Sequence, residues 1–178
     1  MKGIISKKLE ILGGVTSYNT TPVYTAEQIS GFLDEVQRRM QALPEEEVID
    51  FITTYGGSVF HSEVLIPVED KPEFLSGNVP VKAVIGFTSQ PSVVDYMNRY
   101  HNEYQLAVRF FPLFEGVNGD VIFYSLESHT MGAIYYWHNQ GADSAGDLLF
   151  LARTFAGFIA ALYSHKEEEI EPVMASAY

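Results

Sequence analysis

The chain has 178 residues and a formal net charge of −12, with 23 acidic residues against 11 Lys and Arg. This balance argues against binding to nucleic-acid phosphates, which requires Lys and Arg, and favours solubility or a basic partner. The absence of Cys excludes disulfides and thiolate metal sites. No apolar run approaches the roughly 18 residues that a membrane-spanning helix needs, and the N-terminus lacks a secretory signal pattern. We therefore expect a cytoplasmic protein that binds neither nucleic acid nor membrane and uses no cofactor.

Two amphipathic helices are predicted in the first third of the chain. Thr25 and Gln28 have the spacing of a capping box, and apolar residues then recur at helical spacing as far as Leu43. Pro44 suits the first position of a second helix, whose first turn carries three Glu. Gly56 is expected to end this helix, because a residue with positive φ is usually found just past the last turn.

Strand-type patterns follow in the middle of the chain. Short runs rich in β-branched and aromatic residues predict strands at 62–68, 106–114, 120–127 and 132–138. A loop with two Pro is expected over 69–81, and a short helix over 92–104. Asn118 and Gly119 lie between two strand-type runs, which is the strongest short signal for a hairpin with a type I′ turn.

The last predicted element is a single helix over 147–165, with its apolar residues at helical spacing. Helices first, an antiparallel-type sheet in the middle and a closing helix predict an α+β fold, with a central, largely antiparallel sheet flanked by N-terminal and C-terminal helices. We expect one domain over residues 25–165, an N-terminal extension over 1–24 and a charged tail over 166–178. The sequence leaves open whether the extension folds onto the domain.

No pattern of catalytic or metal-ligating residues is convincing, so none is assigned. His129 and His138 are nine residues apart, and the metalloprotease motif HExxH is missing. The stretch ADSAG at 142–146 resembles a nucleophile elbow, but the His downstream, His165, would lie about 30 Å from Ser144 along a helix. We interpret Ser144 as a helix N-cap. A small serine hydrolase centred on Ser144 is kept as an alternative.

The aromatic run at 132–138 raises a question about the protein surface. On a strand, Tyr135 and Trp137 face one side of the sheet, and Tyr136 and His138 face the other. One side then belongs to the core. The other is either core as well or an exposed aromatic surface of the kind that recurs in protein interfaces.

Four stretches, in this order, resemble the SUKH superfamily, which is named partly for fungal cell-wall assembly regulators of the Smi/Knr type. They are LPEEEVIDFITTYGG, FFPLFEGVNGDVIFYSLE, GAIYYWHN and ARTFAGFIAAL, and they span about Leu43 to Leu162. The resemblance implies an α+β fold without a catalytic set. It also implies structural roles for the matching positions, which are Leu43, Pro44, Gly56, Gly57, Gly119, Asp120, Phe155 and Phe158.

The same resemblance suggests a function. Many bacterial members resemble immunity proteins, which neutralise a cognate toxin, often a nuclease or a nucleic-acid deaminase. We therefore expect a non-enzymatic module that binds a basic toxin domain, with a regulatory scaffold of the cell-wall-regulator type as an alternative. The candidate contacts are acids near the divergent connector and nearby aromatic residues, namely Glu63, Glu69, Asp70, Glu73, Tyr136 and His138. The identity of the partner and the oligomeric state remain open.

Overall fold

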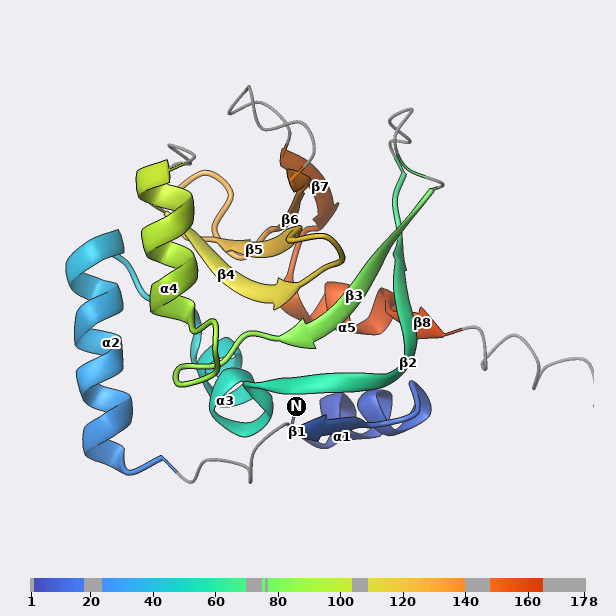
Figure 1. Ribbon diagram of the computed structural model, residues 1–178, viewed down its shortest axis with the longest axis horizontal. Helices are drawn as coiled ribbons and strands as arrows, with labels where there is room; N and C mark the ends of the chain where they lie inside the picture. The colour runs from blue at the N-terminus through green and yellow to red at the C-terminus, as the bar shows by residue number, and fades with distance from the viewer. Residues whose placement is uncertain are drawn as a thin grey trace, which may run out of the picture.

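The computed structural model describes residues 2–17, 24–69, 75, 77–103, 109–139 and 148–164 (Figure 1). Within these ranges the fold is α+β, as the sequence predicts, with one antiparallel sheet of eight strands. The helices are α1 (Lys2–Ile11), α2 (Ala26–Met40), α3 (Glu46–Tyr55), α4 (Val93–Asn98) and α5 (Phe155–Ala161), and a π-helical turn, η1 (Arg99–Glu103), follows α4. The strands are β1 (Val15–Ser17), β2 (Ser58–Pro67), β3 (Asn78–Val84), β4 (Phe110–Glu115), β5 (Val121–Ser125), β6 (Ile134–Trp137), β7 (Leu148–Ala152) and β8 (Tyr163–Ser164).

From β1 to β7 the sheet is a meander in which each strand lies beside its neighbours in the sequence. The order is β1-β2-β3-β4-β5-β6-β7, and β8 pairs with β2. The pairing of β2 shifts its register between Val59 and Val64, which marks a bulge. Figure 1 shows β2 bending sharply along its length. The bend lets the start of β2 pair with β1 and its later part pair with β8.

The central strands are buried on both faces. On one face, the ring of Phe114 packs against Phe51 of α3 and Phe158 of α5, with centroids 5.5 and 5.1 Å away. On the other face, Tyr100 of η1 packs against Phe123 of β5 and Trp137 of β6, at 5.4 and 4.8 Å. Every residue of β5 is buried as a result. The aromatic residues of the middle strands therefore fill two cores, one on each side of the sheet.

The N-terminal segment folds onto the rest of the domain, which the sequence had left open. Leu9 and Leu12 are buried within the main hydrophobic cluster, and α1 packs against α5. Val15–Ser17 then pairs with the start of β2 as an edge strand. Residues 2–17 thus contribute both a helix and a strand to the fold.

The two predicted N-terminal helices are present, with one boundary that differs. Thr25 caps α2, and the reciprocal hydrogen bonds of the capping box to Gln28 are both formed, as predicted. The prediction that Pro44 opens the next helix is wrong, because α3 starts at Glu46 and Pro44 is buried ahead of it. Gly56 does end α3, but its φ is −56° and the positive φ of +80° falls on Gly57.

The expected loop over 69–81 is too long, because β3 already begins at Asn78. Pro80 suggested a loop, yet it pairs with Leu65 of β2 inside a strand. The pairing of β3 with β4 falls at Ala83 and Val84, beyond Pro80. A proline is tolerated at such a position because the missing backbone N–H is needed mainly where a strand has partners on both edges.

The prediction of one closing helix over 147–165 is also wrong. Leu148–Ala152 forms β7 instead, which pairs with β6 and has the register Trp137↔Leu148. Thr154 then caps the shorter helix α5 by accepting a hydrogen bond from the backbone N–H of Gly157, 3.0 Å away. A run of five apolar residues fits a helix or a strand equally well, so periodicity alone could not separate the two.

The predicted hairpin turn is confirmed. Asn118 and Gly119 have φ of +56° and +84°, and the Asp120 backbone N–H donates to the Val117 carbonyl at 2.9 Å. Positive φ at both central residues is the signature of a type I′ turn.

No helix in the described part of the chain combines the length and the hydrophobicity needed to cross a membrane.

A close backbone contact joins the end of α3 to the end of β3 and generates a test of this packing. A Cβ added to Gly86 would lie 2.8 Å from the carbonyl carbon of Gly56 and from the amide nitrogen of Gly57. We predict that Gly86→Ala lowers the free energy of unfolding by about 1–3 kcal/mol, because backbone must move to admit the methyl group. Chemical denaturation would measure the change.

The matched control is Gly31→Ala on α2, where an added Cβ meets nothing within 4 Å. Alanine favours a helix over glycine, so this variant should be more stable by about 0.5–1 kcal/mol. If Gly86→Ala were as stable as the parent protein, the two segments would not be packed as described.

Candidate functional site

The most polar cluster in the interior is centred on Asp120, which stands between the type I′ turn and β5. Its side chain is buried, with 1% of the residue exposed. Tyr136 donates its hydroxyl proton to Oδ2 at 2.5 Å, and the Asn139 backbone N–H donates to Oδ1 at 2.8 Å. His138 Nδ1 lies 3.2 Å from Oδ1. The carboxylate thereby ties the β4–β5 turn to the end of β6.

Further contacts hold the same turn in place. The Tyr100 hydroxyl donates to the Gly119 carbonyl at 2.8 Å, and the Asn139 side-chain amide donates to the Asn118 carbonyl at 2.9 Å. A Cβ added to Gly119 would lie 2.9 Å from Asn139 Nδ2, and the φ angle of Gly119 is positive. Gly119 is therefore required both by the turn geometry and by the space available.

This cluster stabilises the fold and offers limited chemistry. Burial raises the pKa of Tyr136 well above its ordinary value, and the hydrogen bond to Asp120 raises this pKa further. Tyr136 therefore stays protonated at neutral pH and acts as a donor. His138, whose side chain is 16% exposed, has its Nδ1 at 3.2 Å from the Tyr136 hydroxyl as well as from Asp120. Both neighbours orient the imidazole ring.

The structure separates the partner-binding residues that the sequence suggested. Glu63 lies exposed on β2, and Glu69 is exposed just beyond the end of that strand. Tyr136 is buried and faces the interior, so the interpretation of its ring as part of an exposed aromatic surface is corrected. Asp70 and Glu73 lie outside the described residues, as do Ser144 and His165 of the hydrolase alternative. In the part of the chain that is described, no group of three His, Asp or Glu side chains is arranged to hold a metal.

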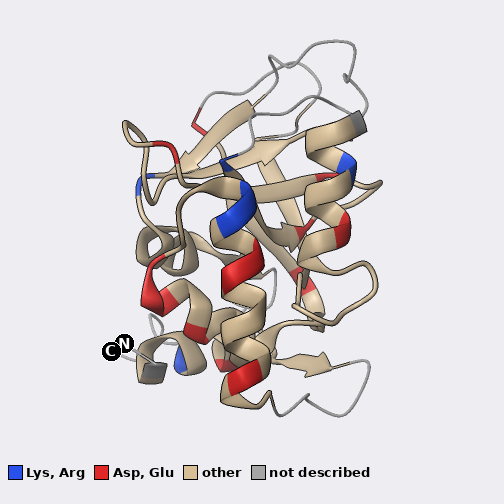
Figure 2. Ribbon diagram, turned by 90° about the vertical axis from the view of Figure 1, so that its left-hand side faces the viewer, with Lys and Arg blue, Asp and Glu red and all other residues tan. Residues whose placement is uncertain are grey.

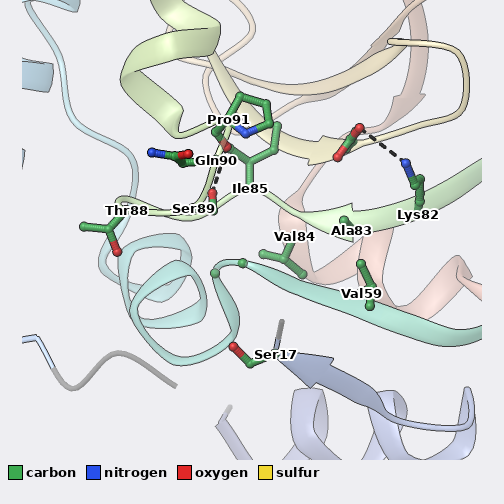
Figure 3. A pocket seen from close by; sticks show the side chains of 13 residues that line it. Ser17, Val59, Lys82, Ala83, Val84, Ile85, Thr88, Ser89, Gln90 and Pro91 are labelled. Carbon is green, nitrogen blue, oxygen red and sulfur yellow. Dashed lines mark hydrogen bonds and ion pairs between the residues drawn. The ribbon is translucent and has the colours of Figure 1, made fainter. Parts of the chain in front are cut away.

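A hollow of about 430 Å³ opens where α3 leads into β2 (Figure 3). Its lining combines backbone at Gly56 and Gly57 with small polar side chains, including Ser17, Thr88 and Ser89. Lys82 and Glu115 lie at its rim and form an ion pair at 3.6 Å. The positive charge of Lys82 is thus matched by a carboxylate, and the lining presents no uncompensated charge cluster.

A second hollow, of about 380 Å³, lies beside α3 and reaches Ile5 of α1. We call it the α3 hollow. It combines three carboxylate side chains with apolar and aromatic surface, and its lining is Ile5, Glu46, Glu47, Asp50, Phe51, Thr54 and Tyr55. Among the residues whose side chains the structure describes, no Lys or Arg lines it. Glu47 Oε1 is buried and has no hydrogen-bond partner. A carboxylate oxygen in that situation favours an incoming cation or hydrogen-bond donor.

Sequence reasoning missed the α3 hollow, because it interpreted the three Glu of this helix only as favourable charges at the start of a helix. The acidic first turn was visible, but nothing in the sequence placed α1 beside α3. Figure 2 shows red acidic positions prevailing on the face formed by α2, α3 and α4. On α2, both Arg38 and Arg39 bond to Glu35, at 2.7 and 2.5 Å, so these two bases are matched within their own helix.

Comparison of the chain with protein-family models and with curated proteins gives no match. The SUKH resemblance therefore rests on the motifs themselves and stays a prediction.

The cluster around Asp120 generates a testable prediction about stability. Tyr136→Phe removes the donor to Oδ2, so a buried carboxylate loses one of its hydrogen bonds. We expect the free energy of unfolding to fall by about 1–3 kcal/mol. The same substitution at the neighbouring Tyr135, which is only partly buried, is the control and should change stability by less than about 0.5 kcal/mol. Equal effects at both positions would contradict the assigned role.

Buried tyrosines also predict how stability depends on alkaline pH. Burial raises the pKa of Tyr124 to about 12, and it raises the pKa of Tyr96 and of Tyr136 further. Tyrosine in an unfolded chain ionises near pH 10, so stability is complete below that pH and declines above it, as the unfolded state loses protons first. Denaturation midpoints and phenolate absorbance would be followed together. Ionisation of these three residues near pH 10 without unfolding would contradict the prediction.

Proposed function

We propose that this chain is a non-enzymatic protein-binding module of the SUKH type, which acts as an immunity protein by binding a basic toxin domain directly. The observation that carries the proposal is the α3 hollow, whose described lining combines three carboxylates with apolar surface and contains no base. Such a site suits the side chain of a Lys or Arg, whose apolar stem and charged head need both kinds of surface.

Electrostatics support a basic partner. A chain with a net charge of −12 repels acidic surfaces and accelerates its encounter with basic ones. Nuclease and deaminase domains carry basic surfaces because their substrates are polyanions. A protein that occupies such a surface competes with nucleic acid and needs no chemistry of its own.

The burial of Glu47 adds specificity to this attraction. Its Oε1 atom is shielded from solvent and has no hydrogen-bond partner. A guanidinium or ammonium group that entered the hollow would supply the missing donor once the Glu47 side chain turned Oε1 towards it. Hydrogen bonds to charged groups contribute about 1.5–3 kcal/mol, so a single well-placed base on the partner would contribute a substantial part of the affinity.

A regulatory scaffold is the second candidate, and it shares the binding surface. It differs in its partner, which would be a host protein encoded elsewhere. The hydrolase alternative depends on Ser144, which lies outside the described residues, and no feature of the described fold favours it.

The test of the function uses the protein encoded beside this chain's gene. Expression of that neighbour alone should arrest growth, co-expression with this chain should restore growth, and the two should co-purify as a complex. A neighbour that is harmless, or one whose toxicity persists without complex formation, would remove the immunity proposal. Co-purification with a host protein encoded elsewhere would favour the scaffold instead.

Charge reversal at the α3 hollow predicts where the partner binds. Glu46 is exposed at its rim, so Glu46→Lys should leave the fold intact and weaken binding about tenfold or more, equivalent to about 1.4 kcal/mol. Calorimetric titration with the neighbour protein would measure the change.

The control is Asp34→Lys, which makes the same change of charge at an exposed position of α2. Its effect should stay within about threefold, since a distant charge contributes mainly to the association rate. Equal losses for the two variants would mean that net charge alone, without the hollow, drives the binding.

A further inference from the structure

The hollow where α3 leads into β2 combines aliphatic surface, small polar side chains and one pair of opposite charges. We call it the β3 hollow, because Lys82, Ala83 and Val84 of β3 line it. Its volume of about 430 Å³ lies near the lower end of the range for ligand sites, which is about 300–1,000 Å³. Such sites are mostly apolar with a few polar groups that orient the ligand. The β3 hollow therefore suits one compact ligand with both apolar and polar parts.

The two charges of the β3 hollow face each other without a hydrogen bond. Lys82 and Glu115 are the charged residues of the described lining, and Lys82 Nζ lies 3.6 Å from Glu115 Oε1. This separation exceeds the roughly 2.7–3.2 Å of a hydrogen bond between nitrogen and oxygen. The two side chains are partly exposed, at 56% and 27%. Each can therefore turn to a ligand group of opposite charge.

The balance of these charges favours a ligand that carries both signs. An anion that bound Lys82 would leave Glu115 unmatched, and it would be repelled by a chain with a net charge of −12. A cation that bound Glu115 would leave Lys82 unmatched in the same way. A zwitterion matches both side chains, because its carboxylate accepts from Lys82 and its ammonium group donates to Glu115.

The rest of the wall argues against two other classes of ligand. A nucleobase binds to proteins largely by stacking on aromatic side chains, and the described lining is aliphatic and polar. An extended peptide adds to a free strand edge, but Ala83 pairs with Val59 on one side and with Glu115 on the other. A compact aliphatic molecule fits the wall better than either class.

The segment that faces Lys82 across the hollow is held in place by its own hydrogen bonds. Ser89 Oγ accepts from the Gly86 backbone N–H at 2.8 Å and donates to the Pro91 carbonyl at 2.8 Å. Figure 3 shows Ser89 and its neighbours across the hollow from Lys82. A preformed wall lowers the entropic cost of binding a small ligand.

We propose that the β3 hollow binds a free α-amino acid with a small polar side chain. Lys82 binds the α-carboxylate, and Glu115 binds the α-ammonium group. The amino-acid side chain then extends over the aliphatic surface towards Thr88, Ser89 and Gln90. Gln90 is exposed, and its amide offers both donors and an acceptor. The proposal is independent of the proposed function, because the described linings of the β3 hollow and the α3 hollow share no residue.

Nuclear magnetic resonance of the isotope-labelled full chain, titrated with L-serine, L-threonine and L-asparagine, tests the proposal. At least one of the three should bind with a dissociation constant of about 1 mM or below. The backbone amide signals of Ala83, Val84 and Ser89 should then shift and reach saturation. If none of the three amino acids produced saturable shifts at these amides, the proposal would be overturned.

Two derivatives of the amino acid that binds most tightly test the charge pair on the wild-type protein. The amino-acid amide lacks the carboxylate, and the N-acetyl amino acid lacks the ammonium group. Each should bind at least about tenfold more weakly, because one charge of the Lys82–Glu115 pair is then unmatched. Equal affinity for all three compounds would contradict the proposed site.

Lys82→Gln and Glu115→Gln assign each charge to one group of the ligand. Lys82→Gln should lose the preference for the free amino acid over its amide, whereas Glu115→Gln should lose the preference over the N-acetyl compound. The control is Arg38→Gln, because Arg38 and Glu35 form an ion pair on α2 with similar exposure, 67% and 30%. This variant should bind like the wild-type protein.

Circular dichroism in the near ultraviolet would establish that each variant is folded. A folded Lys82→Gln or Glu115→Gln variant that kept both preferences would overturn the assignment of the charges. If a variant failed to fold, the two derivatives would still decide the question on the wild-type protein.

Discussion

The central strands of this protein must be covered on both faces, and the rest of the architecture follows from that constraint. Phe114 and Phe123 are buried on opposite sides of the sheet, so neither side can face water. Helices α3 and α5 supply one cover, and η1 supplies Tyr100 to the other. The helices and the strand side chains fill the space between them. The two hollows described above therefore lie outside these cores, one where α3 leads into β2 and the other beside α3 and α1.

Much of the fold could be predicted from local rules in the sequence. The capping box at Thr25 and the turn at Asn118 formed as expected, because each depends on a few neighbouring residues whose geometry is nearly independent of context. Predictions failed where distant pairing decides the structure. Leu148–Ala152 reads equally well as helix or strand, and the availability of the β6 edge makes it a strand. Likewise, Pro80 occupies a strand because of where the pairing with β4 begins.

The candidate site was less predictable than the fold. Asp120 was expected to lead into a strand, but its bonds to Tyr136 and Asn139 join segments that the sequence separates. The sequence analysis allowed Tyr136 to be part of an exposed surface, because residues alternate between the two faces of a strand. Alternation predicts which face of the sheet a side chain lies on, but it does not predict whether other elements cover that face. The α3 hollow depends on Ile5 of α1 lying beside α3. The position of a helix formed by an N-terminal segment is a tertiary property that periodicity does not contain.

The central claim is that an acid-lined hollow beside α3 receives a basic side chain of a partner protein. Hydrogen–deuterium exchange of the chain, measured free and in complex with the partner proposed above, the protein encoded beside it, tests this claim most directly. The account predicts new protection over α3 and over the part of α1 near Ile5, with little change in β5, whose residues are already buried. A complex that protected other surfaces and left the amides of α3 and α1 unchanged would contradict it.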